Sequence, residues 1–350
     1  MRERMLSRAF LASLLAAAAG WESGKTCTTD DVRTLAKKDA KLSGTALAEC
    51  VILDLRGETI APEMLPRQVV VRTGHGIEDK EDTMIEPTTR MPLLTPAQLG
   101  ELLGANSTIS RVQLGWNFGM KEEGAETVAR AIQLNGDTKL RHLEYHLNEM
   151  GDRGGVAFGQ MLAANAQLTR LTLDANRIGG VGAAGLAQGL KTNAKLASLG
   201  LWKNPIGDDG AVALAEALRV NTALKSVALH ACGITANGTA HLLDALMTNT
   251  ALENLDLSGN KIGDAGALEV ARWLQNHPQT KLASLELRGA DITAAGAQAI
   301  ADVVWPRPPP HLIDLDLRGN IISRGVSVGD HMGELPPPIQ WDGPDGQYYQ

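Results

Sequence analysis

The chain has 350 residues and a formal net charge of −7, and aromatic residues make up only 3% of it. This acidity argues against nucleic acid as a partner, because non-specific nucleic-acid binding is driven by basic surface. Three cysteines and eight histidines show neither a disulfide framework nor metal-ligand spacing. We therefore expect no metal, no cofactor and a reduced, cytoplasmic setting.

Residues 1–20 combine a basic start with an apolar run of 12 residues from Ala9 to Gly20. Three interpretations fit this layout: a cleaved secretory signal peptide, an organellar presequence, or an alanine-rich first helix that caps the domain. The first two would place the protein in a secretory or organellar compartment instead of the cytoplasm. The run is too short to cross a bilayer as a helix, so we expect no stable membrane span.

Residues 21–94 follow no clear pattern and form the predicted N-terminal cap region. Within it, residues 50–60 echo the repeat phrase that dominates the rest of the chain, with Glu58 in place of an asparagine. We interpret residues 50–60 as a degenerate capping repeat and residues 61–94 as a long insertion.

A motif in the cap region, which runs from Ala19 to Gly24-Lys25-Thr26, fits a relaxed phosphate-loop pattern. Such a loop needs a buried strand before it and a helix after it, so that backbone N–H groups can surround a phosphate. The preceding run is rich in alanine and poor in β-branched residues, which makes it poor strand material. Nucleotide binding by this segment is therefore a minor alternative.

From residue 95 to residue 322 the sequence repeats the phrase L-x-x-L-x-L-x-x-N-x-I, followed by G-D-x-G and a helical stretch. A fixed period of this length predicts a solenoid of stacked strand–helix units. We count eight copies, and five of their first residues stand 28 residues apart. The copies begin at Ile109, Leu140, Leu168, Leu196, Leu224, Leu252, Leu282 and Leu312.

This phrase resembles the leucine-rich repeat of the ribonuclease-inhibitor type, which is also found in NOD-like receptors and Ran GTPase-activating proteins. The resemblance covers about residues 95–322. It implies an α/β fold, a horseshoe-shaped leucine-rich repeat solenoid with a parallel sheet on the concave face and helices on the convex face. The residues agree, because Leu199 and Leu201 alternate as on a strand. A helical stripe follows them, formed by Ala211, Leu214, Ala215 and Leu218.

Asparagines form two further columns. The first follows the strand, where in this family the side-chain amide satisfies backbone groups in a buried turn. Cys232 occupies this position in the fifth copy, and Ala290 in the seventh, whose turn should be less well satisfied. The second column follows the helices and predicts left-handed C-caps. The first column is Asn117, Asn148, Asn176, Asn204, Asn260 and Asn320, and the second is Asn165, Asn193, Asn221 and Asn249.

The residues between the leucines of each strand face the concave side and form columns across the predicted sheet. Two tryptophans stand out there, because the chain is poor in aromatic residues and tryptophan is enriched at binding hot spots. The candidate residues for partner binding are Trp116, His146, Asp174, Trp202, Lys203, His230, Asp256, Glu286, Arg288, Asp316 and Arg318.

Two of these features also have a purely structural interpretation. Trp202 could pack locally on Lys203 and Pro205. The charged residues could form a self-neutralised ladder, in which two arginines compensate carboxylates on adjacent strands. The members of this ladder are Asp256, Glu286 and Asp316 with Arg288 and Arg318.

The sequence shows no catalytic constellation, so we expect no enzymatic activity. It predicts a monomeric scaffold that binds a protein partner of unknown identity on the concave face. The alternative is a regulator of a small GTPase of the Ran type. Against this alternative stand the eight clear repeats and a tail, residues 323–350, that is rich in proline and glycine and not acidic. We expect this tail to be disordered or loosely draped.

Overall fold

The structure, a computed structural model, divides the chain into two compact units, residues 1–150 and 151–350. The segment 1–20 and the insertion 61–94 lie outside the residues that it describes. The described residues are 25–27, 50–54, 99–100, 103, 109–117, 120–136, 138–165, 167–277, 280–304, 309–322, 327–328, 331–332, 339–342 and 348–349.

In the first unit, short strands pair in parallel in the order of the chain. The strand that opens the stretch 50–60 pairs in register with the strand of the first clear repeat, with Leu53 opposite Val112. This stretch therefore adds a strand to the sheet of the first unit. The described elements are β1 (Lys25–Cys27), β2 (Cys50–Asp54), β3 (Arg111–Gln113), α4 (Lys121–Leu134) and β4 (His142–Glu144).

Strand β1 contains two residues of the phosphate-loop motif. Its Lys25 and Thr26 are extended and pair with β2. In a phosphate loop the equivalent lysine and threonine open a helix, whose N-terminus binds the phosphate. The extended backbone of these two residues counts against a phosphate loop, and the rest of the motif lies outside the described residues.

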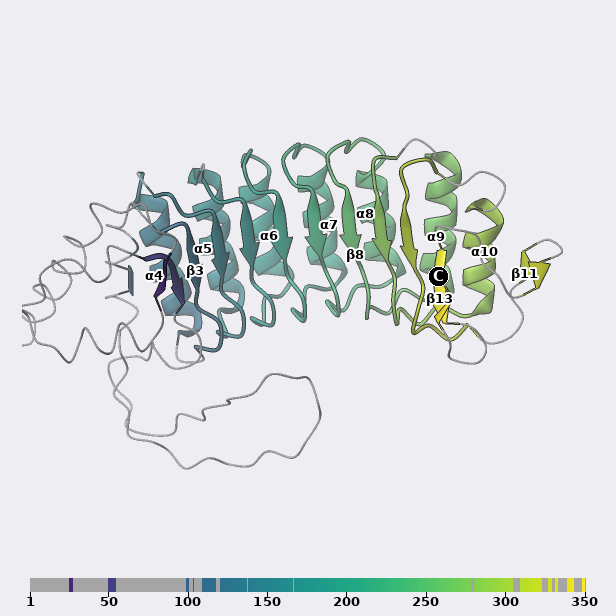
Figure 1. Cartoon of the computed structure of the whole chain (residues 1–350), viewed down its shortest axis with the longest axis horizontal. Helices are drawn as coiled ribbons and strands as arrows, with labels where there is room; N and C mark the ends of the chain where they lie inside the picture. The colour runs from purple at the N-terminus through teal and green to yellow at the C-terminus, as the bar shows by residue number, and fades with distance from the viewer. Residues whose placement is uncertain are drawn as a thin grey trace, which may run out of the picture. The chain divides into compact units, whose positions relative to one another are not determined.

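In the second unit, helices and strands alternate up to β10, and the strands pair in parallel (Figure 1). The strands lie on one side, which we call the strand face, and the helices on the other. This confirms the predicted α/β repeat fold. The elements are α5 (Gly151–Ala164), β5 (Arg170–Thr172), α6 (Gly180–Leu190), β6 (Ser198–Gly200), α7 (Gly207–Leu218), β7 (Ser226–Ala228), α8 (Ala236–Ala245), β8 (Asn254–Asp256), α9 (Gly263–Asn276), β9 (Ser284–Glu286), α10 (Ala294–Val304) and β10 (Asp314–Asp316).

The core of the second unit lies between its strands and helices. Leu199 and Leu201 are buried on the inner side of the chain around β6, so β6 exposes its other side on the strand face. Gly210 lies in the first turn of α7, where a Cβ atom would meet the Cβ atom of Ala183 at 2.9 Å. Glycine therefore permits close packing of α7 on α6. The predicted stripe of α7 is buried, at Ala211, Leu214, Ala215 and Leu218.

The first asparagine column satisfies backbone groups of the buried turns, as predicted. The side-chain oxygen of Asn204 accepts hydrogen bonds from the backbone N–H groups of Asn176 and Ile178, at 2.9 and 3.0 Å. Its side-chain nitrogen donates to the carbonyl groups of Leu173 and Leu201, at 3.0 and 2.8 Å. Each such amide thus joins two successive repeats.

The two exceptions in this column behave differently. The thiol of Cys232 donates to the carbonyl group of Leu201 at 3.2 Å and so replaces one amide contact. The fully buried Ala290 has no polar side-chain atom. The N–H groups of Asn260 and Ile262, which correspond to those that Asn204 binds in an earlier repeat, therefore receive no side-chain acceptor from it.

This gap predicts that Ala290→Asn stabilises the protein. The new amide is expected to accept from the N–H groups of Asn260 and Ile262 and to donate to the carbonyl group of Leu257. Net hydrogen bonds contribute about 1 kcal/mol each, and the larger side chain offsets part of the gain, so we expect an increase of about 1 kcal/mol in the free energy of unfolding. Urea denaturation checks this, and a decrease would mean that the turn does not admit the amide.

The second asparagine column does not form left-handed C-caps, and that prediction is wrong, because none of its four residues has a positive φ. Instead, the side-chain nitrogen of Asn193 donates to the carbonyl groups of Leu162 and Asn165, at 2.7 and 3.0 Å. Its oxygen accepts from the N–H groups of Lys195 and Leu196. These asparagines cap the helix of the preceding repeat with their side chains.

A left-handed turn follows the strand in every repeat. Glycine is favoured in this conformation, whereas other residues adopt it at an energetic cost. Non-glycine residues that are kept there are candidates for a functional role, and Lys203 in the second unit and Trp116 in the first are among them. The residues with positive φ at this turn position are Trp116, Leu147, Ala175, Lys203, Ala231, Gly259, Gly289 and Gly319.

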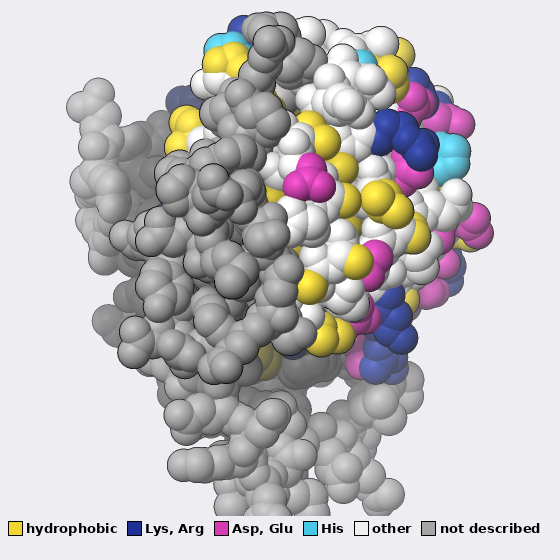
Figure 2. Space-filling model, turned by 90° about the vertical axis from the view of Figure 1, so that its right-hand side faces the viewer, with side chains coloured by type: hydrophobic (Ala, Val, Ile, Leu, Met, Phe, Trp, Pro, Cys, Tyr) yellow, Lys and Arg dark blue, Asp and Glu magenta, His cyan; other side chains and the backbone are white. Residues whose placement is uncertain are grey.

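The described residues of the C-terminal tail form strands of the second unit, which differs from the expected loosely draped segment. Leu315 in β10 pairs in parallel with the buried Ile339 in β13 (Ile339–Asp342), which pairs with β14 (Tyr348–Tyr349). A separate hairpin joins β11 (Ser327–Val328) and β12 (His331–Met332). Seen from this end, acidic and basic side chains lie side by side along one edge of the described surface (Figure 2).

Candidate functional site

Four predicted binding residues form one group on the strand face of the second unit, which we call the Trp202 cluster: Asp174, Trp202, Lys203 and His230. Asp174, Trp202 and His230 occupy the same position after β5, β6 and β7, which pair in register. Parallel strands stand about 4.8 Å apart. A spacing of one repeat in the sequence therefore becomes direct adjacency in the structure.

The indole ring of Trp202 lies at the centre of the cluster. The ring of His230 meets it in a T-shaped arrangement, with centroids 5.6 Å apart and planes at 81°. The ammonium group of Lys203 stands 4.7 Å from the centroid of the Trp202 ring, which is within cation–π range. The expected packing of Trp202 on Lys203 is therefore present, and the ring already makes a cation–π contact within the chain.

Trp202 is only partly buried, but its indole N–H group is buried and has no hydrogen-bond partner among the described residues. A buried donor without an acceptor costs about 1–3 kcal/mol. Packing of this side chain therefore stabilises the fold less than a buried tryptophan with a satisfied N–H group would.

Asp174 lies beside Trp202, and one of its carboxylate oxygens accepts a hydrogen bond from the backbone N–H group of Trp202 at 2.9 Å. Burial raises the pKa of Asp174 to about 6, although this hydrogen bond opposes the shift. No described cation lies within ion-pair distance of its carboxylate. The fold thus holds a carboxylate whose negative charge is poorly compensated.

The residues around the cluster are small. Gly200 stands next to Asp174, and a Cβ atom at Gly200 would lie 3.0 Å from a carboxylate oxygen of Asp174. Ala228 and Ala231 occupy positions adjacent to His230, and both are only partly buried. The Trp202 cluster is therefore surrounded by small residues, and the Asp174 carboxylate lies against the backbone of Gly200.

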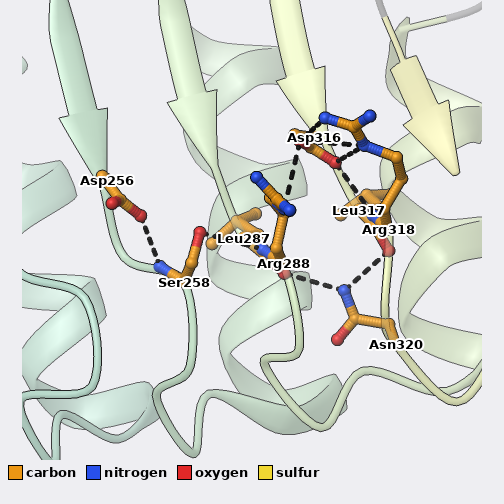
Figure 3. Close-up of polar contacts among 8 residues, drawn as sticks. All are labelled: Asp256, Ser258, Leu287, Arg288, Asp316, Leu317, Arg318 and Asn320. Carbon is orange, nitrogen blue, oxygen red and sulfur yellow. Dashed lines mark hydrogen bonds and ion pairs between the residues drawn. The ribbon is translucent and has the colours of Figure 1, made fainter. Parts of the chain in front are cut away.

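A second group of predicted residues surrounds Asp316, whose side chain is 3% exposed. The guanidinium group of Arg318 binds both carboxylate oxygens of Asp316, with N–O distances of 2.6 to 3.1 Å. Arg288 approaches the same carboxylate at 3.6 Å. Figure 3 shows both arginines directed toward Asp316. The predicted ladder is therefore self-neutralised at this rung.

The neighbouring rungs are not neutralised in this way. The carboxylate of Asp256 accepts a hydrogen bond from the backbone N–H group of Ser258 at 2.8 Å. Glu286, in register with Asp256 and Asp316, forms no ion pair with a described residue. Burial first, and then the carboxylates of Asp256, Asp316 and Asp314, raise the pKa of Glu286. This end of the strand face therefore keeps an excess of negative charge.

In the first unit, Trp116 and His146 form a second pair of a tryptophan and a histidine. Their ring centroids are 6.2 Å apart, with planes at 86°, and 39% of Trp116 is exposed. This pair resembles Trp202 with His230 and remains a candidate on the same grounds.

Two residues of the site were not among the predicted ones. Gly200 matters because it has no side chain, so that the carboxylate of Asp174 can lie against its backbone. Asp314 precedes the predicted columns in the sequence. Its pKa is raised, first by burial and then by the charge of Asp316. One carboxylate oxygen of Asp314 is buried and has no hydrogen-bond partner among the described residues.

The described part of the chain contains no group of three or more histidine, cysteine, aspartate or glutamate side chains that could hold a metal ion. None of its described helices combines the length and apolar character needed to cross a bilayer.

Comparison with protein families finds leucine-rich repeats, described as "Leucine Rich repeat", at residues 192–215, 248–271 and 279–301. No curated protein matches the sequence. These matches assign the repeats of the second unit to the leucine-rich repeat class in general.

Three similar solved structures share little sequence with this chain. The yeast complex of Rad7 and Elc1 is 11% identical, with a TM-score of 0.35, covering 90% of this chain and 71% of that one. The complex of TLR13 with ssRNA13 is 15% identical, with a TM-score of 0.32, covering 66% and 34%. An internalin, InlF, from Listeria monocytogenes is 17% identical, with a TM-score of 0.31, covering 65% and 78%. This chain thus spans about a third of the TLR13 chain.

Proposed function

Because the chain carries leucine-rich repeats, we propose that it is a non-catalytic scaffold that binds a protein partner on the strand face of the second unit. Solenoids offer long surfaces more readily than enclosed pockets, and this favours binding of a macromolecule. The α-helix in each repeat of this unit supports the ribonuclease-inhibitor type of repeat. We propose that the Trp202 cluster is the centre of the contact.

The observation that carries this proposal is the combination of two unfavourable groups in one place. Among the described residues, the indole N–H group of Trp202 has no hydrogen-bond partner and the Asp174 carboxylate has no ion-pair partner, and the two residues lie side by side on the strand face. Both groups carry an energetic cost in the folded chain, although the carboxylate of Asp174 also joins two repeats through its hydrogen bond with Trp202. Perturbed ionisable groups occur often at functional sites, and tryptophan is prominent among residues that dominate binding energy.

The proposal predicts that Trp202→Ala weakens partner capture and leaves the fold intact. Truncation of a hot-spot tryptophan costs about 2 kcal/mol or more, so we expect at least about a tenfold loss of affinity. The protein and the variant are used as baits in the native cell extract, and the captured proteins are quantified by mass spectrometry. Circular dichroism verifies that both baits have the same helix content and thermal midpoint.

A matched control is Leu268→Ala in α9, because 53% of Leu268 is exposed on the helical side of the same unit. The expected result is a partner that the unaltered protein and Leu268→Ala retain and Trp202→Ala loses. A partner retained equally by all three baits would place the interface away from the Trp202 cluster.

A further inference from the structure

We infer that the partner places an arginine side chain against the Asp174 carboxylate and the Trp202 ring, and that this arginine belongs to an extended basic segment lying across the strands. The inference rests on the proposed function and specifies the chemistry of the partner. It is carried by the Asp174 carboxylate, the indole ring beside it, and the excess of acidic groups further along the same face.

The first argument concerns the hydrogen bonds of Asp174. Among the described residues, its carboxylate accepts one hydrogen bond, from the backbone of Trp202. A carboxylate can accept about four. Asp174 is only partly buried, and Gly200 beside it has no side chain. A cationic donor from outside the chain can therefore reach Asp174 without displacing a side chain at Gly200.

The second argument concerns the indole ring. The position of Lys203 above Trp202 shows that the ring attracts a cation in this environment. Lys203 itself is exposed and has no described ion-pair partner. A guanidinium group suits the site better than an ammonium group, because it is planar, stacks on aromatic rings and binds a carboxylate through two parallel hydrogen bonds.

The third argument concerns Glu286 on β9, four strands beyond β5 in the sheet. At about 4.8 Å per strand, Glu286 lies roughly 20 Å from Asp174, which an extended peptide covers in about six residues. Arg288 and Arg318 both bind Asp316, so Glu286 has no ion pair within the described residues. A partner with two basic residues about six positions apart would compensate both carboxylates.

Two peptides test this inference with the purified full-length chain. Each is a fluorescein-labelled glycine–serine decapeptide, with arginine at positions 2 and 8 in one and uncharged citrulline at the same positions in the other. Binding is measured by fluorescence anisotropy at low salt, because salt screens exposed charges. We expect the arginine peptide to bind at least about tenfold more tightly, as a charge-assisted bidentate contact allows.

Four variants locate the site. Asp174→Asn is expected to remove most of the preference for arginine, and Glu286→Gln to reduce it about threefold. Lys203→Ala is expected to strengthen binding, because it removes a competing cation from the ring. The control, Asp209→Asn, removes an equal charge from the first turn of α7 and is expected to leave the preference unchanged.

Equal affinity for both peptides, no binding of the arginine peptide at millimolar concentration, or an unchanged preference in Asp174→Asn would overturn the inference. The proposed function can fail separately. If a captured partner depends on Trp202 but the peptides show no preference for arginine, the scaffold function stands and the arginine inference falls. If the peptides show the preference but no captured partner depends on Trp202, the proposed function falls.

Discussion

Replacement of Asn260 by alanine is expected to lower the free energy of unfolding by about 3–4 kcal/mol, since it leaves several buried backbone groups without partners. The side-chain oxygen of Asn260 accepts from the N–H groups of Cys232 and Ile234, at 2.9 and 3.0 Å. Its nitrogen donates to the carbonyl groups of Leu229 and Leu257, at 2.7 and 2.8 Å. Asn260 itself is 1% exposed, so water cannot replace these contacts directly.

Urea denaturation followed by circular dichroism measures this loss. The control is Asn254→Ala, which makes the same chemical change at an exposed position of β8. We expect the control to stay within about 0.5 kcal/mol of the unaltered protein, as surface substitutions usually do. If Asn260→Ala is no more harmful than Asn254→Ala, the asparagine column does not hold the repeats together.

The same column explains why so much of the fold can be predicted from the sequence. A period of 28 residues places equivalent residues of successive repeats side by side, because parallel strands pair in register. The position of Asn204 after its strand is therefore enough to indicate which backbone groups its side chain contacts. The second column is predicted wrongly, since asparagine caps helices both by a left-handed backbone and by its side chain. The two uses differ in backbone φ, which the repeat period does not specify.

For the candidate site too, strand register predicts which residues are neighbours but not how their side chains are arranged. Register predicts that Trp202 lies next to His230, and that Arg318 lies near Asp316. Register does not predict which carboxylate an arginine selects, and Arg288 and Arg318 both turn to Asp316. That choice depends on burial and on side-chain rotamers, which strand periodicity does not specify. The pattern of leucines likewise does not indicate that the Asp174 carboxylate is partly buried beside Gly200.

A second large effect is expected for Asp174→Asn, which should stabilise the protein at neutral pH. Burial raises the pKa of Asp174 to about 6 in the folded chain, from an ordinary value of 3.8. The folded state therefore binds this proton more tightly than the unfolded state does. The resulting stability is fully present below about pH 4, is lost as the pH rises to about 6, and stays lost above it.

Asparagine cannot ionise, but its side-chain oxygen can still accept the hydrogen bond from the backbone of Trp202. One pKa unit corresponds to about 1.4 kcal/mol, so the shift from 3.8 to about 6 corresponds to about 3 kcal/mol. Because Asp174 is only partly buried, solvent screens part of this, and we expect a gain of about 2 kcal/mol at pH 7–8. At pH 4 the gain should nearly vanish, since Asp174 is then neutral in the folded state. The contribution of Asp264 to stability has the opposite pH dependence, because the hydroxyl group of Thr293 lowers the pKa of Asp264. The effect of Asp174 is therefore obtained from the difference in unfolding free energy between the variant and the unaltered protein at each pH.

Urea denaturation at several pH values from 4 to 8 gives this difference directly. A difference that is constant across the range would show that Asp174 does not titrate abnormally, and would remove one of the two unfavourable groups on which the proposed function rests. A gain that appears only above pH 5, together with loss of the preference for the arginine peptide, would have a different meaning. It would show that the fold keeps Asp174 at the expense of stability because the carboxylate is needed for binding.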